Sequence, residues 1–156
     1  MGNMSLIIRS PEFPDEFAEM YELRRRIFLD ELERDREIET DEHDSTAQHL
    51  VAVQNSQVIG TLRLYLLPGV PRDIKIGRVA VRSDLRGQGI GRALMEAAKE
   101  WSMVQGYDSC YLHAQIAVTG FYELFGYKGE GDVFMEAGTE HLRMRLALGK
   151  DEDQRL

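Results

Sequence analysis

Cysteine and long apolar runs are both scarce in this chain of 156 residues. Cys110 is the single cysteine, which excludes an internal disulfide and any metal site built on paired thiolates. No apolar run approaches the length of a transmembrane helix, and no charged-then-apolar signal peptide opens the chain. We therefore expect a cytoplasmic protein with no membrane partner.

An excess of positive charge is also missing. The chain has 19 lysines and arginines against 27 aspartates and glutamates, a formal net charge of −8. A nucleic-acid-binding surface needs a basic face to neutralise phosphates, so we expect no nucleic-acid partner. The acidity is compatible with a cationic substrate, although we interpret it as a contribution to solubility.

The overall composition, with 43% apolar and 29% charged residues, is typical of a globular protein. Because no repeat, linker or low-complexity segment interrupts it, we expect a single domain over residues 1–148 and a polar tail over 149–156. His43, His49 and His141 lack the spacing of metal ligands, and we predict no metal site.

The apolar periodicity predicts a mixed α/β fold. A helical period predicts a first helix over about 14–33, and the strongly acidic residues 35–47 predict a loop. We interpret this loop as solvated, with attraction of a cationic acceptor as the alternative. Strands over 48–53 and 58–67 are predicted to form a hairpin across Asn55-Ser56, followed by a break at Pro68, Gly69 and Pro71. A central strand over 76–81 and a long helix from Ile90 to a stop at Gly106 are predicted next. The last predicted elements are a strand over 109–113, a short helix over 117–125 and an antiparallel pair of strands over 127–134 and 141–146.

The glycine loop (residues 86–91) joins the central strand to the long helix. Gly87, Gly89 and Gly91 stand at alternate positions, and Arg86 and Arg92 flank them. Such a turn presents backbone N–H groups at the positive end of a helix dipole, which is a site for phosphate oxygens. Together with the following strand it predicts a right-handed parallel βαβ unit.

Three phosphate-binding motifs compete for the glycine loop. A Walker loop needs Gly-Lys-Ser/Thr before the helix, and the chain has none. The dinucleotide fingerprint needs a third glycine where Arg92 stands. The remaining pattern, Arg/Gln-x-x-Gly-x-Gly/Ala, is matched by Arg86, Gly89 and Gly91, although a plain tight turn would also explain so short a pattern.

The surrounding residues resemble a known family. Residues 79–95, VAVRSDLRGQGIGRALM, resemble the acetyl-CoA motif of the GNAT superfamily of N-acetyltransferases, and residues 120–127, GFYELFGY, resemble its second signature. Residues 24–31, 113–115 and 136–144 are similar to the ElaA-like branch. The resemblance implies the acyl-CoA N-acyltransferase fold, a mixed and mostly antiparallel sheet with a parallel split at its centre, flanked by helices.

The resemblance also implies acetyl-CoA as the co-substrate. The backbone of residues 79–81 would pair with the pantetheine arm, and an N–H near Val79 would polarise the thioester carbonyl. The N–H groups of residues 87–92 would hold the pyrophosphate. The implied cofactor-binding residues are Val79, Ala80, Val81, Arg86, Gly87, Gln88, Gly89, Ile90, Gly91, Arg92, Gln115 and Tyr122.

Among these, Tyr122 matches the family's general acid, which protonates the leaving CoA thiolate. A tyrosine that only packs at a helix start is the alternative interpretation. Gln115 stands where many members carry an asparagine that hydrogen-bonds the cofactor, and this departure keeps the amide.

An acceptor amine is mostly protonated at neutral pH, so a base must remove a proton. Glu31 is the leading candidate by resemblance, although it could be an ordinary solvated carboxylate and Leu32 departs from the Glu-Gln pair that the branch often shows. His113 is the alternative base, or else a structural hydrogen-bonding residue. Because Cys110 lies inside a predicted strand, we interpret it as core and expect direct attack without an acyl-enzyme.

The sequence therefore predicts an acetyl-CoA-dependent N-acetyltransferase that acts on a primary amine of a small molecule or peptide. One alternative is a non-catalytic acyl-CoA-binding or regulatory module. Another is an acetyltransferase that acts on protein lysines or N-termini. The acceptor stays open, as does the oligomeric state, although pairing or exchange of the last strands would make a homodimer.

Overall fold

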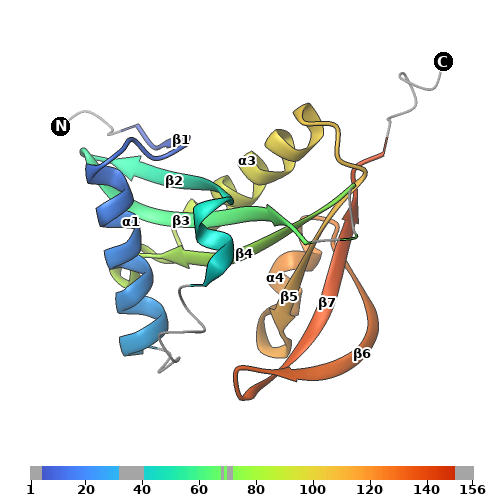
Figure 1. Cartoon of the computed structure of the whole chain (residues 1–156). Helices are drawn as coiled ribbons and strands as arrows, with labels where there is room; N and C mark the ends of the chain where they lie inside the picture. The colour runs from blue at the N-terminus through green and yellow to red at the C-terminus, as the bar shows by residue number, and fades with distance from the viewer. Residues whose placement is uncertain (1–4, 32–40, 68, 70–71, 150–156) are drawn as a thin grey trace. The chain divides into compact units, whose positions relative to one another are not determined.

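The computed structural model describes residues 5–31, 41–67, 69 and 72–149, and the chain forms two compact units (Figure 1). Unit 1 is Met1–Tyr65 with Gly77–Ala98, and unit 2 is Leu66–Ile76 with Lys99–Leu156. Strand β4 (Asp73–Val81) contributes to both. Most of the acidic loop, the break at Pro68 and Pro71, and the tail over 150–156 lie outside the described residues.

The sheet of unit 1 is built from β1 (Ile7–Arg9), β2 (Gln48–Gln54), β3 (Gln57–Leu66) and the second half of β4. Strand β1 pairs antiparallel with β2, and β2 pairs antiparallel with β3. The predicted turn between β2 and β3 is confirmed, and Asn55 and Ser56 have φ of 53° and 62°. Two left-handed residues in succession give the turn that matches the twist of a two-residue hairpin.

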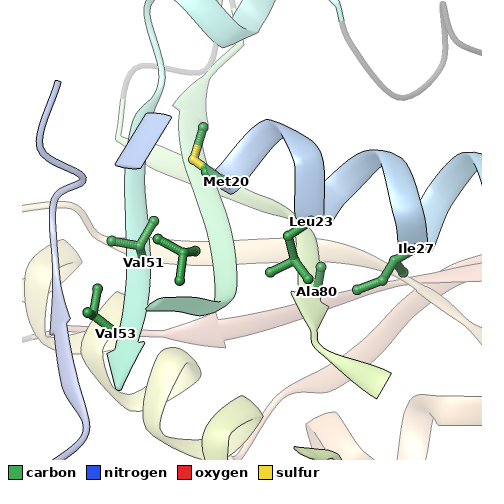
Figure 2. Packing of buried hydrophobic residues seen from close by; sticks show 7 residues of the cluster. Met20, Leu23, Ile27, Val51, Val53 and Ala80 are labelled. Atoms are coloured by element: carbon green, nitrogen blue, oxygen red, sulfur yellow. The ribbon is translucent and has the colours of Figure 1, made fainter. Parts of the chain in front are cut away.

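Helix α1 (Asp15–Arg25) packs on one face of this sheet and continues as a π-helix, η1 (Arg26–Glu31). Figure 2 shows Leu23 and Ile27 beside Ala80 of β4, and Met20 nearer to Val51 of β2. Met20, Leu23, Ile27 and Val51 are all buried. Burial of each such side chain stabilises the fold by about 1.5–3 kcal/mol. The sequence predicted this helix but not its π geometry.

Helix α3 (Ile90–Val104) also forms where the sequence predicted it, and Gly106 follows with φ of 85°. The apolar period of the sequence predicts a buried face that includes Ile90, Leu94 and Ala98, and all three are buried. Val104, at the end of the same stripe, is 76% exposed, and Met95 and Ser102 are buried in addition.

In unit 2, β4 pairs in parallel with β5 (Ser109–Gln115). The pairing begins with Asp73 opposite Ser109 and ends with Lys75 opposite Tyr111. Strand β5 is antiparallel to β7 (Thr139–Ala147), which is antiparallel to β6 (Lys128–Glu136). The strand order along the sheet is β1-β2-β3-β4-β5-β7-β6. This order, with one parallel pair among antiparallel ones, confirms the predicted mixed α/β fold.

The predicted short helix over 117–125 is shorter and has two parts. A 3₁₀ turn, η4 (Ile116–Val118), leads into α4 (Thr119–Glu123). Across the described part of the chain, no helix combines the length and the apolar character needed to cross a membrane.

Candidate functional site

The glycine loop leaves β4 through a 3₁₀ turn, η3 (Ser83–Leu85), and leads into α3. Gly87 and Gly89 have φ of 82° and 85°, a region that L side chains rarely adopt. A Cβ at either position would meet nothing within 4 Å. Backbone conformation, not lack of room, is therefore what requires glycine here. The loop is exposed, whereas Ile90 is buried and anchors the start of the helix.

The first turn of α3 supplies backbone donors. The N–H of Ala93 donates to the carbonyl of Gly89 at 3.0 Å, the first bond of the helical ladder. The N–H groups of Ile90, Gly91 and Arg92 precede this bond, so they have no acceptor within the helix. Together with the helix dipole, they favour binding of an anion such as a phosphate group.

Arginines surround this turn. Arg86 Nε donates to the carbonyl oxygen of Val81 at 3.1 Å, which ties the glycine loop back to the end of β4. Arg82 Nε binds Asp84 at 2.7 Å. Arg86 and Arg92 are both exposed at the rim of the loop, where a guanidinium can approach a phosphate oxygen.

Gly60 on β3 is a positioning residue that sequence reasoning missed. A Cβ built there would lie 3.0 Å from Leu94 Cδ1 and 3.1 Å from Ile90 Cγ2. Glycine thus allows the start of α3 to lie close against the sheet of unit 1. An isolated glycine inside a strand pattern was the available signal, because such a residue often marks close approach of another segment.

Strand β4 is irregular just before residues 79–81, whose backbone is predicted to hold the pantetheine arm and the thioester. Arg78 has φ of 52°, which is uncommon for a residue with a side chain. A conformation of this kind costs on the order of 1–3 kcal/mol and persists only where the surroundings hold it. Val79 and Val81 beside it are partly exposed, and Ala80 is buried in the α1 cluster.

The arginine–aspartate cluster (Arg24, Asp41, Asp44, Arg63 and Arg78) includes this residue. Arg63 donates to both oxygens of Asp41, at 2.7 and 2.8 Å, and to Asp44 at 3.0 Å. Arg24 donates to Asp44 at 2.8 Å, and Arg78 donates to Asp41 at 3.3 Å. Asp44 is 8% exposed and the two guanidiniums on it are 1% exposed. The cluster links α1, β3 and β4 to the segment before β2.

Interpretation of the acidic segment as a solvated loop is wrong for Asp41 and Asp44. Burial opposes their ionisation, but hydrogen bonds and charge outweigh it: Arg63 lowers the pKa of Asp41, and Arg24 lowers that of Asp44. Both carboxylates also cap the 3₁₀ turn η2 (Glu42–Ser45). Their charge is balanced by arginine, so neither supports attraction of a cationic acceptor.

Tyr122 lies on α4 in unit 2 and is partly buried. Its ring contacts those of Phe121 and Tyr127, with centroids 5.1 and 6.2 Å away. Burial raises the pKa of the Tyr122 phenol to about 12. The hydroxyl therefore remains protonated over the whole physiological range, as a hydrogen-bond donor must.

His113 lies on β5 and its Nδ1 is 2.9 Å from Oε1 of Glu136. The edge of its ring meets Phe134 at a centroid distance of 4.9 Å. The sequence indicated His113 as a candidate but not its contact with Glu136, because the two residues are 23 positions apart along the chain. The Ala137-Gly138 pair after Glu136 indicates only a tight turn at that point.

The remaining predicted residues occupy separate positions. Gln115 ends β5 and is partly exposed. Glu31 ends η1, and its side chain is outside the described part of the chain. Cys110 is fully buried, burial raises the pKa of its thiol, and its Sγ lies 3.4 Å from the hydroxyl of Tyr127. The interpretation of Cys110 as a core residue is confirmed.

Within each unit, the structure brings some of these residues together. Unit 1 contains residues 79–92 of the predicted cofactor site, and unit 2 contains Gln115, Tyr122 and His113. Among the residues that the structure describes, no group of three His, Cys, Asp or Glu side chains has the arrangement that could hold a metal ion.

Comparison with protein families gives one match that spans most of the chain. The model described as the acetyltransferase (GNAT) family matches residues 17–127. The Escherichia coli protein ElaA is 28% identical over 109 residues, which cover 69% of this chain and 71% of ElaA. These matches confirm the resemblance that the motifs predicted, including the ElaA-like branch.

Solved structures show the same fold. The crystal structure of ElaA superposes with a TM-score of 0.80 and 24% identity, covering 92% of this chain and 99% of that one. An acyl-CoA N-acyltransferase from Pseudomonas aeruginosa has a TM-score of 0.77 and 27% identity over 93% and 100% of the chains. A GNAT family acetyltransferase from Brucella melitensis, in complex with acetyl-CoA, has a TM-score of 0.73 and 24% identity over 94% and 90%.

Proposed function

Because the chain belongs to the acetyltransferase (GNAT) family, we propose that it transfers the acetyl group of acetyl-CoA to a primary amine of a small molecule or peptide. The observation that carries the proposal is the glycine loop, where left-handed Gly87 and Gly89 precede the open first turn of α3. The acetyl-CoA bound to the Brucella melitensis protein supports the choice of donor.

The donor would be held mainly by backbone. N–H groups of residues 87–92 would donate to the diphosphate oxygens, with Arg86 and Arg92 at the rim. The backbone of residues 79–81 would pair with the amides of the pantetheine arm as an added strand does. An N–H of Val79 or its neighbour would polarise the thioester carbonyl and stabilise the oxyanion that develops there. Gln115, at the end of β5, would add a side-chain amide to this site.

The reaction is a direct attack. The neutral amine forms a C–N bond with the carbonyl carbon while the C–S bond breaks, and the thiolate leaves. The nitrogen then loses its second proton, which neutralises the thiolate to give CoA. The acceptor starts as an ammonium, so it must first lose a proton to a base, for which Glu31 and His113 are the candidates. The overall reaction yields the amide, free CoA and one proton.

Tyr122 would assist the departure of sulfur. Its pKa of about 12 exceeds that of an ordinary thiol, about 8.5, by roughly 3.5 units, so full transfer of its proton to a free thiolate is uphill by about 5 kcal/mol. We therefore assign Tyr122 to hydrogen-bond donation as negative charge develops on sulfur. Completed transfer would require that water reprotonates the phenol.

A panel of amines with acetyl-CoA tests the proposal. We expect saturable release of thiol together with an equal amount of acetylated amine for at least one acceptor. Tight binding of CoA without turnover of any amine would contradict the proposal and favour the acyl-CoA-binding module. Acetylation of proteins in a lysate, seen by intact mass, without turnover of small amines would favour a protein acetyltransferase.

A further inference from the structure

The hydrogen bond between His113 and Glu136 determines which ring nitrogen carries a proton. Nδ1 of His113 lies 2.9 Å from Oε1 of Glu136. An ionised carboxylate only accepts hydrogen bonds, so Nδ1 must donate, and the neutral ring then keeps its lone pair on Nε2. No described residue makes a hydrogen bond to Nε2, and the side chain is 21% exposed. The ring thus presents a basic nitrogen to solvent.

The position of Glu136 is fixed by a tight hairpin. Glu136 ends β6 and stands directly opposite Thr139 on β7. Ala137 and Gly138 between them have φ of 51° and 82°, two left-handed residues as a two-residue turn requires. The turn therefore fixes the backbone position of Glu136, and the hydrogen bond with His113 places its carboxylate.

Aromatic rings fix the orientation of the imidazole. Phe134 meets His113 edge-on at 4.9 Å and stacks on His141 at 6.0 Å. Tyr111, two residues before His113 on the same face of β5, lies 6.2 Å away. His141 Nδ1 is 2.9 Å from the carbonyl of Thr139, so it donates there. Its Nε2 lies 3.8 Å from the second oxygen of Glu136.

Several charged groups surround the pair. The hydrogen bond from His113 lowers the pKa of Glu136 against the opposing effect of burial, and the charge of Lys75 on β4 lowers it further. Arg143 on β7 stands opposite His113, but its guanidinium lies over Tyr111 at 4.2 Å and binds Glu130 at 3.2 Å. Glu136 is therefore the carboxylate that stabilises a positive charge on His113.

His113 and Tyr122 belong to opposite faces of β5. Tyr122 packs on Tyr127, whose hydroxyl contacts Cys110. Side chains alternate along a strand, so Cys110 and His113, three residues apart, point to opposite faces.

We propose that His113 is the base that accepts the proton of the acceptor ammonium at Nε2, and that Glu136 is the positioning residue that holds the ring in this tautomer. This inference rests on the proposed function and selects His113 over Glu31. The N–H bond of the ammonium breaks and its proton binds Nε2, which leaves a neutral amine to attack. The imidazolium, stabilised by Glu136, then returns the proton to water.

The test measures the pH dependence of kcat/KM for the preferred amine in the wild type, Glu136→Gln and His113→Ala. The matched control is Glu140→Gln, which removes an exposed carboxylate from the same hairpin. Loss of Glu136 releases the ring from the tautomer that keeps a lone pair on Nε2. We therefore expect the plateau of kcat/KM to fall by at least about tenfold in Glu136→Gln, while His113→Ala loses about a hundredfold or more. Acetyl-CoA affinity and melting temperature verify that each variant is folded.

A second readout does not depend on turnover. Nitrogen-15 NMR of the wild-type histidine rings should show His113 with a proton on Nδ1 and a lone pair on Nε2, and Glu136→Gln should shift this tautomer balance. A ring protonated at Nε2 when neutral would overturn the inference. An unchanged plateau of kcat/KM in Glu136→Gln would also overturn it, while acetyl transfer by the wild type still stood. If the wild type acetylates no amine, the proposed function fails first and the inference fails with it.

Discussion

At the scale of single residues, Tyr122 is the proposed hydrogen-bond donor to the leaving sulfur, and burial raises the pKa of its phenol to about 12. We predict that Tyr122→Phe lowers kcat about a hundredfold, because the sulfur loses a hydrogen bond in the transition state. The affinity for acetyl-CoA, measured by calorimetry, should stay within about twofold, since this bond strengthens only as C–S breaks.

The raised pKa of Tyr122 also predicts how kcat depends on pH. The protonated phenol is the active form and persists at every pH below about 12, so its ionisation should produce no basic limb in kcat up to about pH 10. Tyr107→Phe is the control, because it removes a hydroxyl from a ring that stacks on Trp101 of α3 and has no proposed role in the reaction. Full activity of Tyr122→Phe at every pH would exclude Tyr122 as the hydrogen-bond donor to sulfur.

Asp44 is a residue whose contribution is to stability. We predict that Asp44→Asn lowers the free energy of unfolding by about 3–5 kcal/mol, because it leaves the buried guanidinium of Arg24 without its carboxylate. Asp108→Asn removes an exposed carboxylate from Arg72 and should change it by about 1 kcal/mol or less. Urea unfolding of both variants makes the comparison, and equal losses would contradict the assignment.

At the scale of elements, the glycine loop and the first turn of α3 together form the proposed binding site for the diphosphate of CoA. Gly89→Ala places a Cβ at φ of 85°, which costs about 1–2 kcal/mol or forces the loop to another conformation. Either change misdirects the N–H groups before α3. We predict that the affinity for CoA in calorimetric titration falls about tenfold or more.

Gly106→Ala is a matched control for this substitution. Gly106 also has φ of 85° with nothing within 4 Å of an added Cβ, but it follows the other end of α3. It should lose similar stability and keep its affinity for CoA. If both variants bind CoA as the wild type does, the glycine loop does not hold the diphosphate.

Local sequence patterns predicted some features of these elements and not others. The Asn55-Ser56 hairpin and the extent of α3 follow from local turn chemistry and from periodicity, which depend on neighbouring residues alone. The burial of Met95 and Ser102 does not follow in this way, because neither belongs to the apolar stripe and burial depends on packing that the period does not encode. The π geometry of η1 likewise has no periodic signal in the sequence.

At the scale of the whole molecule, the buried ionisable groups predict how stability depends on pH. Burial lowers the pKa of His49, and arginine partners hold the pKa values of Asp41 and Asp44 low. Each folded-state pKa lies below its unfolded value, so each contribution is present above the unfolded pKa and is lost as pH falls through the folded one. We predict that the free energy of unfolding declines below about pH 6.5 and more steeply below about pH 4.

Urea unfolding at a series of pH values measures this decline. Asp44→Asn should show a smaller loss between about pH 4 and pH 2 than the wild type, because it lacks one of the carboxylates that must be protonated. Stability that stays constant from neutral pH to about pH 3 would contradict the role of these groups.

The candidate site was only partly predictable for a related reason. The glycine loop and Tyr122 lie in contiguous motifs, which a single sequence displays. The contacts of Asp41 with Arg78, and of Glu136 with His113, join residues that are distant along the chain. Neither pair has a local signal, and only the fold brings its members together.

The central claim, that the glycine loop holds the diphosphate of CoA and the backbone of β4 holds the pantetheine arm, has a direct test. The measurement is a nitrogen-15 NMR titration of the backbone amides with CoA and, separately, with pantetheine, which lacks the diphosphate. We predict that CoA shifts the amides of Gly87, Gly89 and Ile90 together with that of Val79, whereas pantetheine shifts only that of Val79. Saturable binding of CoA that leaves the amides of the glycine loop unmoved would contradict the claim.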